Sequence, residues 1–359
     1  MSDAAPDSDL VGRLRAASDD ELVAILAAAD AADVAMHAPG GQRLLPVPRP
    51  NPGTTEIVLL GALGCRYGML AGGAGGHLVR TATTSVLVDP GPAALTLLLQ
   101  LVDRGRFAWS ELDAICVAHF HPDHYTDLIP CLEAMASHTT GRALLVANPT
   151  TAARFTAFSP YHAGGMAEVV TLAHPDTEGD GDPSIKVGDL TIHATPAVHT
   201  EETGRTRSAI GLAYQSPAGG IWYTSDTNLM PGLLDRVAEL LSDTALVIAH
   251  ADASNINQPP GRAQACHLET RDVPTIAATL KPAHILIQHY DAAYATPEYR
   301  IAQAVWLQRL LDRDRTATQV LPSASGLRLT LTGGRITDHA IELNSDAGPP
   351  VAAYLHPLP

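Results

Sequence analysis

The sequence is poor in cysteine, lysine and aromatic residues, and it has no long hydrophobic run. Its four cysteines lie far apart and form no C-x-x-C pair, which argues against a disulfide framework. No apolar stretch approaches the ~18 residues that cross a bilayer, so we expect no membrane segment. The first residues contain neither a basic nor an apolar signal region, and we therefore expect a cytoplasmic protein.

The shortage of lysines and of aromatic rings bears on the partners of the protein. Only Lys186 and Lys281 are lysines, and the formal net charge is −15 at pH 7. Aromatic residues make up 4% of the chain, so platforms on which bases could stack are scarce. Because an acidic surface repels phosphate backbones, the composition argues against long nucleic acid and favours a small substrate.

What the chain does have is a globular composition and an excess of histidine. Hydrophobic residues make up 46% and charged residues 17% of the 359 residues, which is typical of a folded protein with a large core. The same chain contains 16 histidines. Their role is the main question that the composition raises.

A proline-rich segment divides the chain. Before it, Ser18 and Glu21 form an S-x-x-E capping box, and the apolar residues Leu22, Ile25 and Leu26 follow on one helical face. The segment itself contains Gly40, Gly41, Pro46, Pro48, Pro50 and Pro52. We predict a helical extension with its connector over residues 1–52 and a main domain over residues 53–359. The extension either packs on its own domain or forms a homodimer, and the sequence leaves both open.

Short β-type runs alternate with helical stretches through the main domain. The predicted strands are 56–60, 85–88, 114–118, 190–197, 210–214, 221–224, 246–249 and 285–288, and the predicted helices are 93–102, 231–241 and 273–280. Residues 171–183 combine acidic and turn residues and are predicted to form a loop. Strands in two halves with helices between them predict an α/β (α+β) fold of layered sheets covered by helices.

One cluster of residues indicates metal chemistry. His119, His121, Asp123 and His124 form an H-x-H-x-D-H pattern directly after the predicted strand 114–118. Imidazole and carboxylate together suit zinc, and manganese or iron less well. Two histidines one residue apart can reach one ion while the adjacent Asp-His pair addresses a second, so the spacing favours two metals.

Three further polar residues end predicted strands in the same way. His199 follows the apolar run 192–198, Asp226 follows 221–225, and His289 follows 285–288. A single histidine at a strand end is commonly a structural polar residue. Three such residues beside a four-ligand motif indicate that they complete the metal shells.

These motifs resemble those of the metallo-β-lactamase superfamily of metallo-hydrolases, over residues 56–334. The resemblance also includes Asp89, in the run Val86-Leu87-Val88-Asp89-Pro90-Gly91. It implies an αββα sandwich with two metals at one edge of the paired sheets. It further implies that His119, His121 and His199 hold the first metal, that Asp123, His124 and His289 hold the second, and that Asp226 bridges both. Asp89 would orient a ligand from outside the metal shell.

The C-terminal part is similar to the ribonuclease Z branch, which contains phosphodiesterases. The similarity lies in the run His250-Ala251-Asp252-Ala253, in Cys266-His267-Leu268-Glu269 and in His289-Tyr290-Asp291. In that branch a histidine at the position of His267 faces the scissile phosphate, and a His-Glu-Ala-Thr motif supplies a carboxylate. The glutamate is absent here, and Asp252 or Glu269 is the candidate replacement. We place His250 and Asp252 outside the metal shell, as supporting residues.

The expected function is therefore that of a zinc-dependent hydrolase with two Zn²⁺ per chain, acting on a small phosphodiester such as a cyclic nucleotide. Asp123 and His267 are the predicted catalytic residues. Asp123 or Asp226 would accept or orient the proton of water, and His267 would protonate the leaving group. Arg66, Arg205 and Arg207 flank the predicted site and are candidates for holding an anion. The alternatives are a lactone, thioester or amide hydrolase, a tRNA 3′-processing endonuclease and a mononuclear iron sulfur dioxygenase.

Overall fold

The computed structural model describes residues 13, 15–37, 47–64, 69, 73–138, 141–201, 208–252, 267–291, 295–343 and 348–356. The chain divides into two compact units, Met1–Pro46 and Val47–Pro359. Residues 47–52, which the sequence assigned to the connector, therefore belong to the second unit. No helix in the described part of the chain is long and apolar enough to cross a membrane.

The first unit contains the helix that its capping box predicted. Helix α2 spans Asp19–His37. The backbone N–H and the hydroxyl of Ser18 donate to Glu21 Oε2 at 2.8 and 2.9 Å, and the N–H of Glu21 donates to Ser18 Oγ at 3.3 Å. The capping box is therefore formed, and the side chains of Ile25 and Leu26 are exposed.

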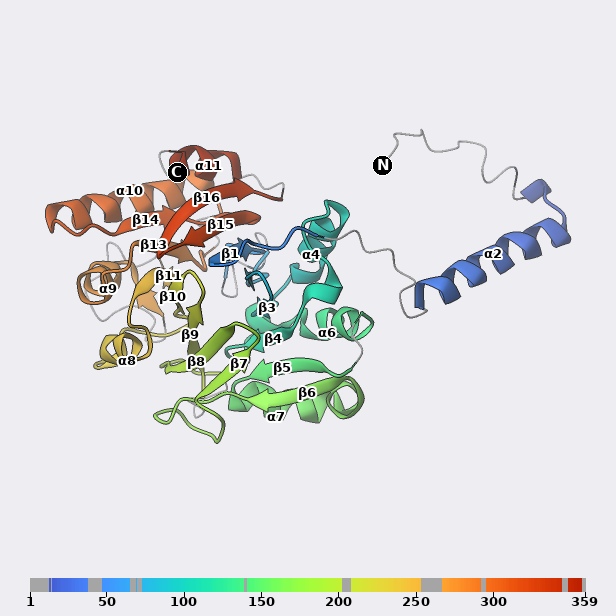
Figure 1. The fold of residues 1–359 in the computed structure, drawn as a ribbon, viewed down its shortest axis with the longest axis horizontal. Helices are drawn as coiled ribbons and strands as arrows, with labels where there is room; N and C mark the ends of the chain where they lie inside the picture. Colours follow the sequence, from blue (N-terminus) through green and yellow to red (C-terminus); the bar gives the residue numbers. More distant parts are fainter. Residues whose placement is uncertain are drawn as a thin grey trace. The chain divides into compact units, whose positions relative to one another are not determined.

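The second unit is built on two sheets (Figure 1). The first sheet has the order β16-β15-β1-β2-β3-β4-β5-β6. Its strands are β1 (Thr54–Leu59), β2 (His77–Arg80), β3 (Ser85–Val88), β4 (Ala114–Val117), β5 (Ala143–Ala147), β6 (Ala167–Thr171), β15 (Leu327–Thr332) and β16 (Arg335–Ile341). Strands β3, β4 and β5 run parallel to one another.

The second sheet has the order β14-β13-β11-β10-β9-β8-β7, and the short β12 pairs with β11. Its strands are β7 (Ser184–Val187), β8 (Leu190–Pro196), β9 (Ile210–Ser216), β10 (Gly219–Tyr223), β11 (Thr244–Asp252), β12 (Leu268–Glu269), β13 (His284–Gln288) and β14 (Gln319–Pro322). Strands β10, β11 and β13 run parallel. The predicted loop 171–183 joins β6 to β7.

Helices cover the outer faces of both sheets. The helical elements of the second unit are α4 (Ala94–Asp103), η1 (Trp109–Glu111), α5 (Pro122–Tyr125), α6 (Leu128–Ala136), α7 (Pro149–Phe158), η2 (His162–Met166), α8 (Leu233–Leu240), η4 (Thr270–Asp272), α9 (Val273–Leu280), α10 (Pro297–Arg313) and α11 (Gly348–Leu355). Alternate residues of β1 show how the layers form, because Ile57 packs between the sheets while Val58 packs under α4 and α6. A third apolar cluster joins the second sheet to α8, α9 and α10. The architecture is an αββα sandwich, as predicted.

The parallel strands explain where polar side chains gather. In the first sheet Asp89 follows β3 and His119 follows β4. In the second sheet Asp226 follows β10, His250 lies near the end of β11, and His289 follows β13. Carboxyl ends of parallel strands meet at the same edge of a sheet, so the topology brings these residues to one edge of the sandwich.

Candidate metal centre

Asp226 lies at the centre of the cluster at this edge. It is 2% exposed, and its Oδ2 lies 3.6 Å from His119 Nε2 and 3.4 Å from His124 Nε2. Its Oδ1 lies 2.8 Å from His250 Nδ1 and 3.4 Å from His289 Nε2. One buried carboxylate therefore faces imidazoles that come from both sheets.

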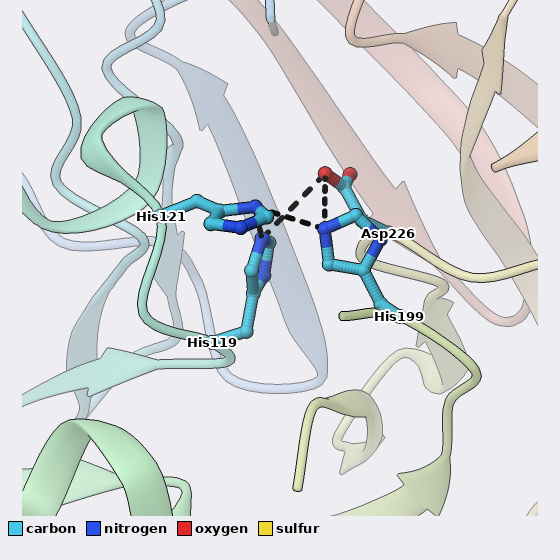
Figure 2. Close-up of side chains that lie close together, drawn as sticks. All are labelled: His119, His121, His199 and Asp226. Atoms are coloured by element: carbon cyan, nitrogen blue, oxygen red, sulfur yellow. Dashed lines mark hydrogen bonds and ion pairs between the residues drawn. The ribbon is translucent and has the colours of Figure 1, made fainter. Parts of the chain in front are cut away.

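The first candidate ligand group consists of His119, His121, His199 and Asp226 (Figure 2). Their ligand atoms all lie within 4.8 Å of one another. His121 Nδ1 lies 3.2 Å from His119 Nε2 and 2.9 Å from His199 Nε2. The structure thus brings together the three histidines that the resemblance assigned to the first metal.

The second candidate group differs in one member from the set that the resemblance implied. It consists of His124, Asp226, His250 and His289, and its ligand atoms also lie within 4.8 Å of one another. His250 was predicted to support the site from outside the metal shell, yet its ring stacks on that of His289 with centroids 4.5 Å apart. Asp123 lies beside the group, with Oδ2 3.0 Å from His289 Nε2 and 3.5 Å from His124 Nε2.

Asp89 holds His124 in place. It is 1% exposed, and its Oδ2 lies 2.8 Å from His124 Nδ1 and accepts the hydroxyl of Tyr223 at 2.6 Å. Its Oδ1 accepts the N–H of Ala118 at 2.7 Å. With Nδ1 bound to a carboxylate, the Nε2 of His124 points toward Asp226.

His267 is also part of the cluster. Its Nε2 lies 3.2 Å from Asp226 Oδ2, and its ring stacks on His199 with centroids 5.3 Å apart.

Asp252 ends β11 and pairs in register with Glu269 of β12. The backbone N–H of Glu269 donates to Asp272 at 2.8 Å. The three predicted anion-binding arginines, Arg66, Arg205 and Arg207, lie outside the described residues.

Sequence reasoning missed several residues that support the cluster. Gly64 is one of them, because a methyl group there would lie 2.0 Å from His289 Cδ2. Glu201 is another, since it is 7% exposed and accepts the N–H of Phe120 at 2.7 Å. The position of Glu201 two residues after His199 was the only signal in the sequence, and it is too weak to assign a role.

The comparisons with known proteins agree with this architecture. The family model for the beta-lactamase superfamily domain matches residues 84–290, more than half of the chain. The chain belongs to the metallo-β-lactamase superfamily. As a metallo-β-lactamase-fold protein it is a metallo-hydrolase by family, and its His/Asp clusters can hold metal ions.

Relatives of this metallo-β-lactamase-fold protein occur in archaea and bacteria. The uncharacterised protein MJ1374 of Methanocaldococcus jannaschii is 27% identical over 289 residues, which covers 78% of this chain and 96% of that protein. A ribonuclease Z of Kineococcus radiotolerans is 25% identical over 242 residues, covering 65% of this chain and 70% of that protein. The metallo-β-lactamase-fold protein YhfI of Bacillus subtilis has the same fold, with a TM-score of 0.55, 17% identity and coverage of 77% of this chain and 99% of YhfI.

The residues at the centre fit the metal ions that the superfamily implies. His124 Nε2 and His250 Nε2 are buried and make no hydrogen bond to any described residue. A cavity of about 10 Å³, lined by both of these histidines and by Asp89, Asp123 and His289, offers space for about one water-sized species. Imidazole nitrogens and carboxylate oxygens are ligands that zinc takes in proteins.

The charges at the centre are also suited to metal binding. Burial keeps the pKa of His119 well below its usual range and lowers the pKa of His250 to about 3, so both rings are neutral. Burial alone would raise the pKa of Asp226, but His289, His124 and His267 hold it well below its usual range. The pKa of His124 is raised despite burial by the carboxylates around it, so metal binding there releases a proton.

Proposed function

We propose that the protein is a phosphodiesterase that uses two zinc ions to hydrolyse a small phosphodiester, such as a cyclic nucleotide. The observation that carries the proposal is the position of Asp226, which belongs to both candidate ligand groups. A carboxylate shared by two sets of imidazoles suits two cations held side by side. Such a pair can stabilise the attacking and leaving oxygens of a displacement at phosphorus.

The chain's own residues have separable roles in this proposal. Two cations held there would supply hydroxide near neutral pH by lowering the pKa of water from ~15.7 toward ~7. Asp123, which lies 3.0 Å from His289, orients the proton of the attacking water. His267, with Nε2 3.2 Å from Asp226 Oδ2, is held at the edge of the cluster and donates a proton to the leaving oxygen.

The relatives and the charge support a small phosphodiester. The ribonuclease Z relative bears the name of an enzyme that cleaves RNA, and RNA linkages are phosphodiesters. A net charge of −15 disfavours a long polyanion on this chain. We therefore propose the same bond type in a smaller molecule, and tRNA processing is the less favoured alternative.

The test combines metal analysis with turnover. We expect zinc-loaded protein to contain two zinc ions per chain and to hydrolyse bis(p-nitrophenyl) phosphate or a cyclic nucleotide. Asp226→Asn keeps the size of the side chain but removes the shared charge, so this variant loses both zinc and turnover. Asp235→Asn, at an exposed position on α8, is the matched control and keeps both. Full activity in metal-stripped protein would refute the proposal.

A second candidate is hydrolysis of a lactone, thioester or amide at the same site. The observation that favours it is Ala251, which stands in β11 where the ribonuclease Z motif has glutamate. Turnover of such carboxyl compounds by zinc-loaded protein, with none on phosphodiesters, would establish this candidate instead. Two zinc ions and no iron per chain would exclude the third alternative, a mononuclear iron sulfur dioxygenase.

A further inference from the structure

Glu201 is a buried carboxylate that the proposed mechanism does not use. It is 7% exposed, and both of its oxygens are hydrogen-bonded. Oε1 accepts the backbone N–H of Phe120 and the side-chain amide of Asn148, each at 2.7 Å, and Oε2 accepts the hydroxyl of Ser208 at 2.6 Å. Burying a carboxylate costs free energy, and three short hydrogen bonds to its oxygens offset part of that cost.

The bond to Phe120 joins the two segments that carry the three histidines of the first ligand group. Phe120 lies between His119 and His121, and Glu201 lies two residues after His199. The three imidazoles of the group therefore come from segments about 80 residues apart in sequence, and His121 Nδ1 still lies 2.9 Å from His199 Nε2. The carboxylate of Glu201 is a direct link between these two segments.

The other two partners anchor this link to both sheets. Asn148 follows β5 of the first sheet and caps α7, where its side chain accepts the N–H of Thr151 at 3.2 Å. Ser208 lies just before β9 of the second sheet, and its hydroxyl also lies 2.6 Å from that of Thr150. The network thus holds the ends of the two sheets at a fixed separation beside the ligand group.

We propose that Glu201 is a positioning residue that sets the spacing of His119, His121 and His199 and so determines the affinity of the first ligand group for its metal. The proposal rests on the metal-binding part of the proposed function. Without this carboxylate, the N–H of Phe120, the amide of Asn148 and the hydroxyl of Ser208 lose a common acceptor. The bonds from Asn148 to Ser208 remain, but the segment that carries His199 loses its link to Phe120, so the three imidazoles no longer meet at one point.

Two substitutions separate the geometry of Glu201 from its charge. In Glu201→Gln the amide oxygen still accepts from Phe120 and Asn148, so the link between the histidine segments is kept. Only the bond to Ser208 is lost, because Ser208 Oγ already accepts from Asn148 Nδ2 at 2.9 Å and from the N–H of Thr150 at 3.2 Å and cannot accept from the new amide as well. Glu201→Ala removes all three bonds. We expect Glu201→Gln to bind zinc like the wild type, and Glu201→Ala to bind about one zinc per chain tightly and the other about 10- to 100-fold more weakly.

The control is Glu111, another buried glutamate, which lies in η1. Its Oε2 lies 3.1 Å from Arg80 Nη2, and it precedes β4, whereas His119 follows β4. Glu111→Ala is expected to lower the melting temperature and to leave both zinc affinities unchanged. A merely structural role for Glu201 predicts this same result for Glu201→Ala, and that result would overturn the proposal.

A double-mutant cycle identifies which group is affected, with zinc affinity measured by competition with a chromophoric chelator. The double variant Glu201→Ala/His121→Ala should bind zinc no more weakly than His121→Ala alone. The loss of zinc affinity in Glu201→Ala should, by contrast, add to the loss in His250→Ala. If Glu201→Ala does not fold, Glu201→Asp, which is one methylene shorter, is used in the same cycle. Additivity with His121→Ala would refute the proposal. Wild-type protein that binds two zinc ions but hydrolyses no phosphodiester would refute the proposed function and leave this test intact.

Discussion

Replacing Asp89 by asparagine is the sharpest test of how the second ligand group is oriented. Asp89 Oδ2 takes part in two contacts, one with His124 Nδ1 at 2.8 Å and one with the hydroxyl of Tyr223 at 2.6 Å. Oδ1 accepts the N–H of Ala118 at 2.7 Å. In Asp89→Asn the amide oxygen remains with Ala118, because a backbone N–H can only donate, and the N–H₂ group then faces His124.

The substitution changes the tautomer of His124. With a donor facing Nδ1, the neutral ring carries its proton on Nε2, the atom that lies 3.4 Å from Asp226 Oδ2. A protonated Nε2 cannot bind a cation. Loss of such a supporting carboxylate weakens metal binding by about 10- to 100-fold, which corresponds to about 1.4 to 2.8 kcal/mol. We expect this loss in Asp89→Asn, and a smaller loss in Tyr223→Phe, which removes only one donor to Asp89.

Zinc competition with a chromophoric chelator measures the effect directly, with turnover as a second readout. Asp113→Asn is the matched control, because Asp113 accepts the N–H of Ser85 at 2.8 Å at the other end of β4. The control should keep wild-type zinc affinity. Wild-type zinc affinity in Asp89→Asn would show that His124 is not oriented by this carboxylate, and the reasoning would fail.

Two further predictions concern packing and pH. Gly64→Ala should displace the His289 ring, because the new methyl group would lie 2.0 Å from its Cδ2. We expect urea unfolding to show a destabilisation of about 1 to 3 kcal/mol, together with weaker zinc binding. Unchanged zinc binding would contradict this prediction. His77 is fully buried, and burial lowers its pKa to about 4, so the unfolded state binds more protons and stability falls as the pH drops from about 6.5 to 4. Protonation of His77 in the unfolded state lowers the free energy of unfolding by about 2 kcal/mol at pH 5. In His77→Phe this contribution to the pH dependence should be absent. Equal pH dependence of wild type and variant in denaturant titrations between pH 7 and 5 would contradict this role of His77.

Local sequence pattern was sufficient for the elements around the centre. Short apolar runs predicted β3, β4, β10, β11 and β13, and Val273–Leu280 was predicted with the bounds that helix α9 has. The capping box of Ser18 and Glu21 also formed as predicted. These features depend on residues a few positions apart, so the chain itself specifies them.

Other elements carry weaker local signals. Strands β2, β5, β6 and β7 were not predicted, and neither were α10 and the C-terminal hairpin β15–β16. Strand β2 is short, and its four residues His77–Arg80 are all buried, including the histidine and the arginine. A buried polar residue in a short strand gives no alternation that a sequence pattern could detect.

The sequence by itself determined the types of candidate ligand and their places at strand ends, because a strand followed by H-x-H-x-D-H is a local pattern. Only the tertiary structure decided which side chains share Asp226. In the structure His250 belongs to the second ligand group, and Asp123 lies beside that group. It also decided that Glu201 links Phe120 to both sheets. The physical reason is that these distances join residues from tens to more than 160 positions apart, and the packing of one sheet on the other sets them.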